Sequence, residues 1–188
     1  MAVSREEMLE YFCDLSLDPN TAHYYLSVEG RKTLVRNPEP IPYPDNPERF
    51  DGLPQVLCKE RLTGRCYWEA DWRGLGDMVV SYRDIGRKGE SWNSRFGANN
   101  RSWILSCFIG EKLIAWHDNV GEYLPLPSTP YNRIAVYLDE DAGILSFYSV
   151  PDAKTLHHLY TFNTKFTEPL CAGFVLYTES VKLCDPSD

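Results

Sequence analysis

Short runs of apolar residues recur about every ten residues through most of the chain, and this spacing restricts the possible folds more than any other feature. Glycine, proline, asparagine or aspartate residues separate the runs. Such a pattern is typical of an antiparallel β-sandwich or barrel. The sequence therefore predicts one all-β domain, with strands at residues 54–58, 65–72, 77–83, 102–108, 112–117, 133–138, 144–150, 156–162 and 170–178.

The N-terminal part of the chain carries the best helix signal. Residues 4–12 have apolar side chains at helical spacing, and Ser4 and Glu7 have the spacing of a capping box. We therefore expect a short helix there. Two short strands are expected next, at residues 24–28 and 31–35, because a Glu-Gly pair separates them as in a hairpin.

Two other segments are expected to be loops or turns. Residues 36–54 contain six prolines, which predicts an ordered loop or a sheet edge rather than a strand. Residues 139–143, "DEDAG", have some acidic residues of a calcium loop, but Ile144 stands where that loop needs glycine. A tight hairpin between two strands explains this segment better.

The stretch "RCYWEADW" raises the question of a catalytic carboxylate pair. In an extended strand the side chains alternate between two faces. Glu69 and Asp71 would share a face with Cβ atoms roughly 6.5–7 Å apart, a spacing that a glycosidase could use. The interpretation we favour is a core strand with the acidic residues as hydrogen-bond acceptors on the opposite face. The core face would hold Cys66, Trp68, Ala70 and Trp72. The opposite face would hold Tyr67, Glu69 and Asp71.

Charge and hydropathy argue against two classes of partner. The chain has 27 acidic and 19 basic residues, a net charge of −8, whereas a domain that grips nucleic-acid phosphates usually carries the opposite sign. No apolar stretch approaches the roughly 20 residues of a membrane helix. Residues 1–12 lack the basic and apolar regions of a signal peptide. We expect no nucleic-acid binding and no membrane segment.

Cysteine usage predicts the compartment. The chain has six cysteines, none in a CxxC pair, and a domain of this size does not need disulfide bridges for stability. Free, mostly buried thiols and a cytoplasmic location follow. The alternative is a secreted protein with disulfides. The six residues are Cys13, Cys58, Cys66, Cys107, Cys171 and Cys184.

The sequence shows no motif for catalysis, metal binding or a cofactor. It contains no GxSxG elbow, no P-loop and no dinucleotide fingerprint. The cysteines lack the paired spacing of a zinc site. His157 and His158 are adjacent on a predicted strand, so they would face opposite sides and could not bind one ion together. We expect no catalytic residue, no metal and no cofactor.

Residues 83–96, "RDIGRKGESWNSRF", place basic side chains beside aromatic ones. This combination can bind RNA or an anionic metabolite. A solvated loop between two strands and a partner-contacting loop are the other interpretations. The residues concerned are Arg83, Arg87, Lys88, Trp92, Arg95 and Phe96.

Five blocks of sequence, in order, resemble the signature blocks of the PRY-SPRY domain family. They are "LSLDPNTAHYYLSV", "PERFDGLPQVLCKERLTGRCYWEADW", "RFGANNRSWILSC", "IAVYLDEDAGILSFYSV" and "FTEPLCAGF". The resemblance covers residues 13–184 and looks closest to fish TRIM and NLR-type proteins and to stonustoxin-like toxins. It implies a bent sandwich of two antiparallel sheets, a concanavalin-like jelly roll, with PRY at about 13–60 and SPRY at about 61–184. Residues 1–12 would be a helical lead-in.

The resemblance also implies a function. PRY-SPRY domains are non-catalytic protein-interaction modules, so the chain would be the target-recognition domain of a TRIM-type ubiquitin ligase or an NLR-type immune protein. Any ligase activity would lie in other domains of the parent protein. The alternative is the C-terminal domain of a stonustoxin-like pore-forming subunit. An oligomeric parent protein is compatible with either.

Carried over by position, the partner-binding surface consists of variable loops around a shallow pocket. Ser106 and Phe108 stand where the antibody-binding family member has tryptophans, which argues against antibody binding. The segments 36–47 and 84–95 are expected rims, and Phe108, Trp92 and Tyr177 are expected anchors because aromatic residues dominate interface energetics. The predicted partner-binding residues are Asp77, Arg87, Trp92, Ser106, Phe108, Tyr177 and Thr178.

Overall fold

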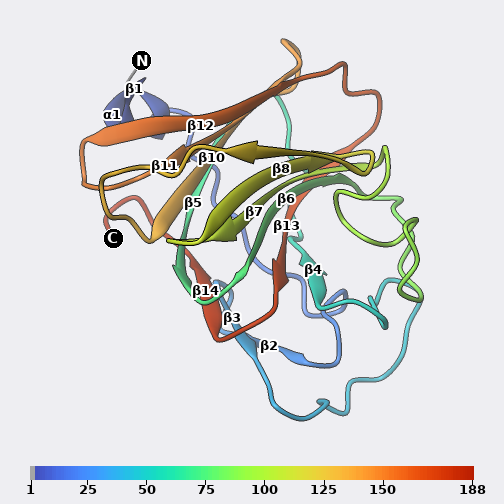
Figure 1. Cartoon of the computed structure of the whole chain (residues 1–188). Coiled ribbons are helices and arrows are strands. Elements are labelled where there is room, and N and C mark those ends of the chain that lie inside the picture. Colours follow the sequence, from blue (N-terminus) through green and yellow to red (C-terminus); the bar gives the residue numbers. More distant parts are fainter. Residues whose placement is uncertain (1–2) are drawn as a thin grey trace.

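The computed structural model describes residues 3–188 and confirms an all-β fold with one short N-terminal helix (Figure 1). Residues 1 and 2 of the expected lead-in lie outside the described residues. The elements are β1 (Val3–Ser4), α1 (Arg5–Leu9), β2 (Leu26–Glu29), β3 (Thr33–Arg36), β4 (Gln55–Leu57), β5 (Arg65–Arg73), β6 (Gly76–Tyr82), β7 (Ser102–Phe108), β8 (Lys112–His117), β9 (Val120–Leu124), β10 (Arg133–Asp139), β11 (Ile144–Ser149), β12 (Thr155–Asn163), β13 (Leu170–Leu176) and β14 (Ser180–Leu183).

The strands form two antiparallel sheets. The larger sheet has eight strands in the order β1-β12-β11-β10-β5-β14-β3-β2, and the smaller sheet has six in the order β4-β13-β6-β7-β8-β9. Trp68 and Val136 from the larger sheet and Met78, Leu105 and Phe174 from the smaller one belong to the same buried cluster. The two sheets therefore pack face to face over one main core, which is the expected sandwich.

Both faces of β5 are buried. Trp68 and Trp72 lie in the main core, as the alternation predicts. On the other face Tyr67 is fully buried and Glu69 is only 2% exposed. The segment after α1 covers this face, because Tyr67 N–H donates to the Tyr11 carbonyl and Cys13 N–H donates to the Tyr67 carbonyl. The acidic face of the strand is thus a second packed layer.

Helix α1 is shorter than expected, and its predicted capping box is wrong. Ser4 is the N-cap residue, but its side chain makes no capping hydrogen bond. Ser4 lies in extended conformation and pairs with Thr155 at the edge of β12, and the Arg5 N–H donates to the Lys154 carbonyl. Packing of Met8 on a small buried cluster holds the helix in place instead.

Three strands were not expected from the sequence: β1, β9 and β14. The first four of the five residues of β9 are exposed, so the strand has no buried face to give an alternating pattern. A tight turn with positive φ at Asp118 and Asn119 joins it to β8. The proline-rich segment has no strand beyond Arg36, the last residue of β3, and β4 begins directly after it.

The six cysteines are free thiols in the structure. Cys13 is half-buried and the other five are buried. Among residues 3–188, no helix has the length and apolar character needed to cross a membrane.

Candidate functional site

One line of register crosses all six strands of the smaller sheet and forms the floor of a cavity. Each residue pairs with the next across adjacent strands, and the line runs Gln55, Val175, Asp77, Ser106, Ile114, Tyr123. The residues between them in sequence, such as Met78 and Leu105, face the main core. The line therefore faces outward, and all six side chains line a cavity of about 330 Å³.

The loop after β6 closes the rest of this outer face. Val79 and Ile104, two residues further along their strands, pack under Phe50 and Phe96 in a second buried cluster. Gln55 fixes the loop, because its side chain donates to the Ser94 carbonyl at 2.7 Å and accepts from the Phe96 N–H at 2.9 Å. The cavity is the part of the sheet face that the loop leaves uncovered.

Aromatic side chains form the open side of the cavity. Phe108 and Tyr177 meet edge to face with ring centroids 6.1 Å apart. The ammonium group of Lys112 lies 5.0 Å from the centroid of Phe108, within the range of a cation–π contact. Tyr123 is 72% exposed and Tyr177 is 40% exposed. Exposed aromatic residues grouped at one concave site are typical of a binding surface.

Asp77 is the charged residue at the centre of the floor. Its side chain is buried, with the residue 3% exposed, and its Oδ1 atom has no hydrogen-bond partner among the described residues. Burial raises the pKa of Asp77 to about 7, while Ser106 and Arg95 lower it to a lesser extent. Oδ1 of Asp77 therefore lacks the hydrogen-bond donor that a buried oxygen atom normally has.

The structure brings four of the predicted partner-binding residues together. Asp77, Ser106, Phe108 and Tyr177 all line the cavity. The expectation of a pocket built by loops needs one correction, because its floor is the sheet itself. Loops supply only the rim, including Pro54 and the segment 95–98.

Three predicted residues lie elsewhere. Trp92 is 68% exposed on the loop after β6 but does not line the cavity. The Thr178 hydroxyl accepts a hydrogen bond from the Leu75 N–H at 3.0 Å. Arg87 donates to the carbonyls of Glu48 and Arg83 at 2.6 and 2.7 Å, so its guanidinium holds loops together.

The basic residues of the segment 83–96 are mostly occupied by internal contacts. Lys88 donates to the carbonyls of Asn46 and Arg49 at 2.8 Å, and Arg83 donates to the Cys58 carbonyl at 2.9 Å. The Lys88 contacts tie the loop to the proline-rich segment, and the Arg83 contact ties it to the residue after β4. They argue against an anion site there, and burial of Ser94 and Phe96 argues against a fully solvated loop.

The expected rim segment 84–95 contributes Arg95 to the cavity, whereas five other lining residues were not predicted from the sequence: Gln55, Lys112, Ile114, Trp116 and Tyr123. Pairing across the sheet brings them to Asp77: Gln55 reaches it through β13, and the residues of β8 and β9 reach it through β7. Ser106 pairs with Asp77 only in the observed register of β7 on β6. The sequence does not fix that register, and a shift by one residue would place the side chains of β7 on the opposite faces. Family position supplied Ser106 in its place.

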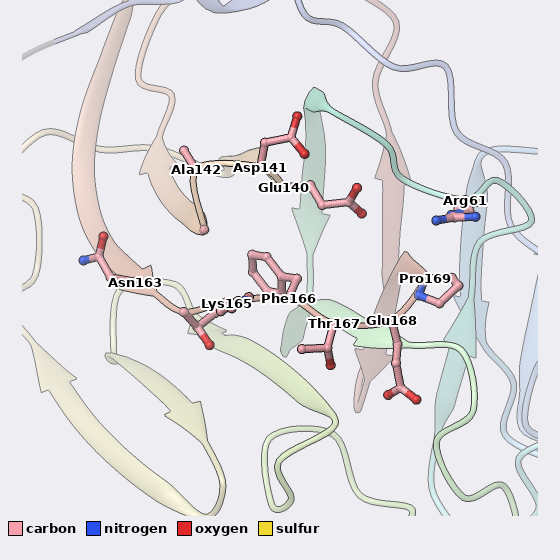
Figure 2. A pocket seen from close by; sticks show the side chains of 12 residues that line it. Arg61, Glu140, Asp141, Ala142, Asn163, Lys165, Phe166, Thr167, Glu168 and Pro169 are labelled. Atoms are coloured by element: carbon pink, nitrogen blue, oxygen red, sulfur yellow. The ribbon is translucent and has the colours of Figure 1, made fainter.

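A second, larger cavity lies between the β10–β11 turn and residues 163–169. Its volume is about 630 Å³, and Figure 2 shows Glu140, Asp141 and Glu168 around it together with Arg61 and Lys165. The charges are mixed, and Glu168 is already paired with Arg101. Among the described residues, no buried polar atom without a partner belongs to its lining.

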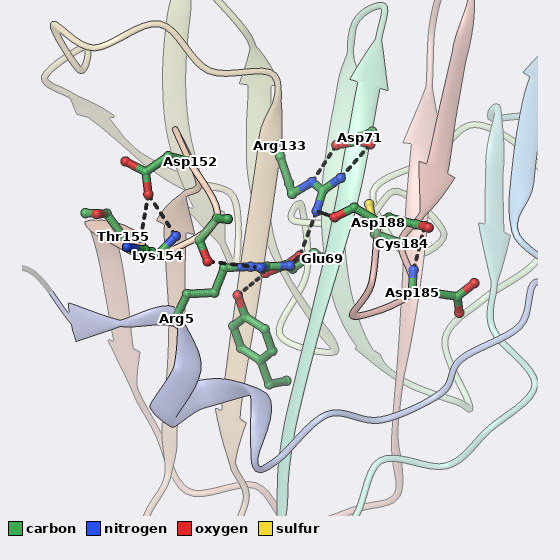
Figure 3. Close-up of polar contacts among 12 residues, drawn as sticks. Arg5, Glu69, Asp71, Arg133, Asp152, Lys154, Thr155, Cys184, Asp185 and Asp188 are labelled. Atoms are coloured by element: carbon green, nitrogen blue, oxygen red, sulfur yellow. Dashed lines mark hydrogen bonds and ion pairs between the residues drawn. The ribbon is translucent and has the colours of Figure 1, made fainter.

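The carboxylate pair of β5 is occupied by arginines, as Figure 3 shows. Glu69 accepts hydrogen bonds from Arg5 and from Tyr67, and Asp71 accepts two from Arg133 at 2.7 and 3.0 Å. These contacts confirm that the acidic residues are hydrogen-bond acceptors. Carboxylates neutralised in this way, one of them buried, are structural rather than catalytic.

A β-sandwich with an aromatic-rimmed hollow on the outer face of one sheet defines a class of recognition modules. Two family models match the chain, the "SPRY-associated domain" (PRY) over residues 15–62 and the "SPRY domain" over residues 65–188. The chain belongs to the PRY-SPRY family. It is therefore a protein-interaction domain and a binding domain rather than a catalytic one.

Known proteins with similar sequences fall into two groups. The chain is 38% identical over 174 residues to neoverrucotoxin subunit alpha of Synanceia verrucosa, covering 92% of this chain and 25% of that protein. It is 40% identical over 178 residues to tripartite motif-containing protein 16 of Mus musculus, covering 92% of this chain and 31% of that protein. The chain thus spans about a quarter to a third of these relatives.

A solved structure shows the same fold. The crystal structure of the TRIM65 PSpry domain superimposes with a TM-score of 0.85 at 27% sequence identity. The match covers 96% of this chain and 94% of the solved chain, so the two domains correspond over nearly their whole length.

Proposed function

We propose that this domain is the target-recognition module of a TRIM-type ubiquitin ligase or an NLR-type innate immune protein, and that it binds its protein target at the cavity over Asp77. The observation that carries the proposal is the convergence of Asp77, Ser106, Phe108 and Tyr177 on one cavity. Binding there needs no cofactor, and any ubiquitin transfer would take place in other domains of the parent protein.

The cavity has the properties of an interface centre. Its floor is rigid, because it consists of paired strands, and its rim offers aromatic anchors at Phe108, Tyr177 and Tyr123. Interface hot spots cluster in such pockets and are rich in aromatic residues. A cytoplasmic location is part of this proposal, since buried free thiols are typical of reducing compartments.

A capture experiment with the purified domain tests the proposal. The double substitution Asp77→Ala with Phe108→Ala should abolish capture of the target from lysate of the source tissue, while the far-UV circular dichroism spectrum of the variant stays that of the folded domain. Lys154→Ala, an exposed change in the β11–β12 turn, should affect neither. Normal capture by the double variant, or loss of capture by Lys154→Ala, would place the interaction surface elsewhere on the domain.

A second candidate is the C-terminal domain of a stonustoxin-like pore-forming subunit. The 38% identity to neoverrucotoxin subunit alpha over 92% of this chain favours it. In that setting the cavity would serve contacts between subunits, and the protein would be secreted. The full reading frame of the parent gene separates the two candidates, because RING, B-box and coiled-coil segments support the ligase and a membrane-attack-type fold supports the toxin.

A further inference from the structure

The carboxyl group of Asp77 has an unfilled position for a hydrogen-bond donor. It is buried on the cavity floor, and Oδ1 has no partner among the described residues. An unpaired buried polar group destabilises the fold, and a carboxylate does so more than a neutral group. Such a group persists at a binding site when a ligand supplies the missing partner. A ligand that fits this cavity should therefore carry a hydrogen-bond donor.

The groups around Asp77 do not fill this position. Tyr177, following β13, has its pKa raised to about 12 by burial and then by the charge of Asp77, so its hydroxyl stays protonated. Burial also raises the pKa of Cys107, on β7, well above the usual value, so that thiol is neutral. Arg95, on the loop before β7, and Lys112, on β8, are exposed cations at the rim.

The shape and lining of the cavity narrow the class of donor. A volume of about 330 Å³ lies at the lower end for ligand pockets and suits a single inserted side chain. Aromatic residues surround the entrance, including Phe108, Tyr177 and Tyr123. A buried carboxylate below aromatic rings suits a cation, which gains a charge-assisted hydrogen bond and cation–π contacts together. Lys112 already places an ammonium group over Phe108.

The two rim cations oppose a cationic ligand only weakly. Arg95 and Lys112 are exposed, so solvent and salt screen their charges. Asp77, in contrast, is removed from solvent, where electrostatic interactions are stronger. Direct contact with the buried carboxylate therefore outweighs repulsion from the rim.

Building on the proposed function, we infer that the target inserts a basic side chain, lysine or arginine, into the cavity, with its N–H groups donated to the carboxylate of Asp77. The aromatic rim encloses the aliphatic part of that side chain. Asp77 binds it in the ionised form. Recognition therefore strengthens as pH rises through the titration of this carboxyl group.

Amino-acid amides serve as probes in titrations followed by ¹⁵N NMR of the domain at pH 7.5. N-acetyl-arginine amide and N-acetyl-lysine amide should give saturable shifts at residues of the cavity floor. N-acetyl-citrulline amide, which keeps the donor without the charge, and N-acetyl-norleucine amide should bind at least about tenfold more weakly. Affinity for the arginine probe should rise about tenfold from pH 6 to pH 8, because the ionised fraction of a group with a pKa of about 7 rises by that factor.

Variants tie these effects to one residue. Asp77→Asn should lose most of the affinity for the arginine probe and all of its pH dependence, and the spectrum of the variant reports whether it is folded. Phe108→Leu keeps the carboxylate and should weaken binding to a smaller extent. Asp141→Asn, an exposed change of the same charge in the β10–β11 turn, should have no effect.

Three results would overturn the inference. They are equal binding of the citrulline and arginine probes, unchanged binding by Asp77→Asn, and affinity that falls as pH rises. The last would mean that protonated Asp77 donates to an acceptor on the ligand. If these probes fail while the double variant still loses its target, the cavity remains the binding site and only the choice of a basic side chain is wrong.

Discussion

Arg5 and Glu69 form a buried two-bond ion pair between the N-terminal helix and strand β5. Nε of Arg5 lies 2.6 Å from Oε2 of Glu69, and Nη2 lies 2.8 Å from Oε1. The two side chains are only 6% and 3% exposed. The residues expected to be a lead-in are therefore joined to the centre of the larger sheet.

Glu69→Gln is predicted to destabilise the domain strongly. The amide cannot neutralise Arg5 and Arg133, and breaking a buried ion pair from one side typically costs about 3–5 kcal/mol. This loss is of the same size as that expected for Trp68→Ala in the main core. Urea denaturation measures both, with the exposed change Glu111→Gln as a control that should stay within about 0.5 kcal/mol.

The same pair predicts a loss of stability in acid. Burial alone would raise the pKa of Glu69, but hydrogen bonds from Arg5 and Tyr67 and the charges of both arginines bring it below the ordinary value of 4.5. A carboxyl group whose pKa is lower in the folded chain stabilises the fold above its unfolded pKa, and this is lost as pH falls. The free energy of unfolding should decrease below about pH 5, and less steeply in Glu69→Gln.

Asp77 predicts the opposite dependence on pH. Its pKa is raised to about 7 by burial, so the folded chain binds the proton more tightly than the unfolded chain, and stability falls as pH rises toward that value. Asp77→Asn removes this effect. Its stability relative to the wild type should improve by about 2–3 kcal/mol between pH 5 and pH 8, since one pKa unit corresponds to about 1.4 kcal/mol.

Urea titrations at the two pH values check this result. Asp141→Asn should show no such change, because that carboxyl group is exposed. If the free energy of unfolding of Asp77→Asn differs from that of the wild type by the same amount at pH 5 and pH 8, the pKa of Asp77 is not raised in the folded chain.

Thiol chemistry separates the cytoplasmic and secreted candidates. All six cysteines should react with iodoacetamide after unfolding without reductant, because none is bridged. In the native state Cys58 and Cys107 should stay unlabelled, since burial raises their pKa values far above neutral pH. Mass spectrometry of the labelled peptides counts the sites. Thiols that become available only after reduction would support the toxin-like candidate.

Local patterns predicted much of this fold, and their failures share one physical cause. The β5 alternation correctly placed Trp68 and Trp72 in the core, because side chains on a strand face opposite sides whatever the partner. Strand β6 is buried along its whole length, so alternation could not show that Asp77 lies on the outer face, at the floor of the cavity. The register between distant strands and the coverage by loops depend on long-range contacts, which local periodicity does not contain.

The candidate site shows the same division. Family position identified Asp77, Ser106, Phe108 and Tyr177, which meet in the cavity, but also Thr178, which bonds to the chain at Leu75. The sequence does not show that the side chain of a loop residue such as Thr178 is hydrogen-bonded to the backbone of another loop.

The last prediction concerns Gln55, the first residue of the line across the smaller sheet. Its amide bonds to the Ser94 carbonyl and the Phe96 N–H, which holds the loop over the sheet and sets the position of the cavity rim. Gln55→Leu has a similar size but leaves both backbone groups without these partners, at a cost of about 1–3 kcal/mol for each buried group.

In Gln55→Leu we expect faster hydrogen exchange at the Phe96 amide and weaker target capture, whereas the amide of Ile104 within β7 should exchange as in the wild type. Asn163→Leu, an exposed amide without a side-chain hydrogen bond among those described, is the matched control. If exchange at Phe96 is unchanged in Gln55→Leu, the loop is held by the packing of Phe50 on Phe96 rather than by the amide, and the rim of the cavity does not depend on Gln55.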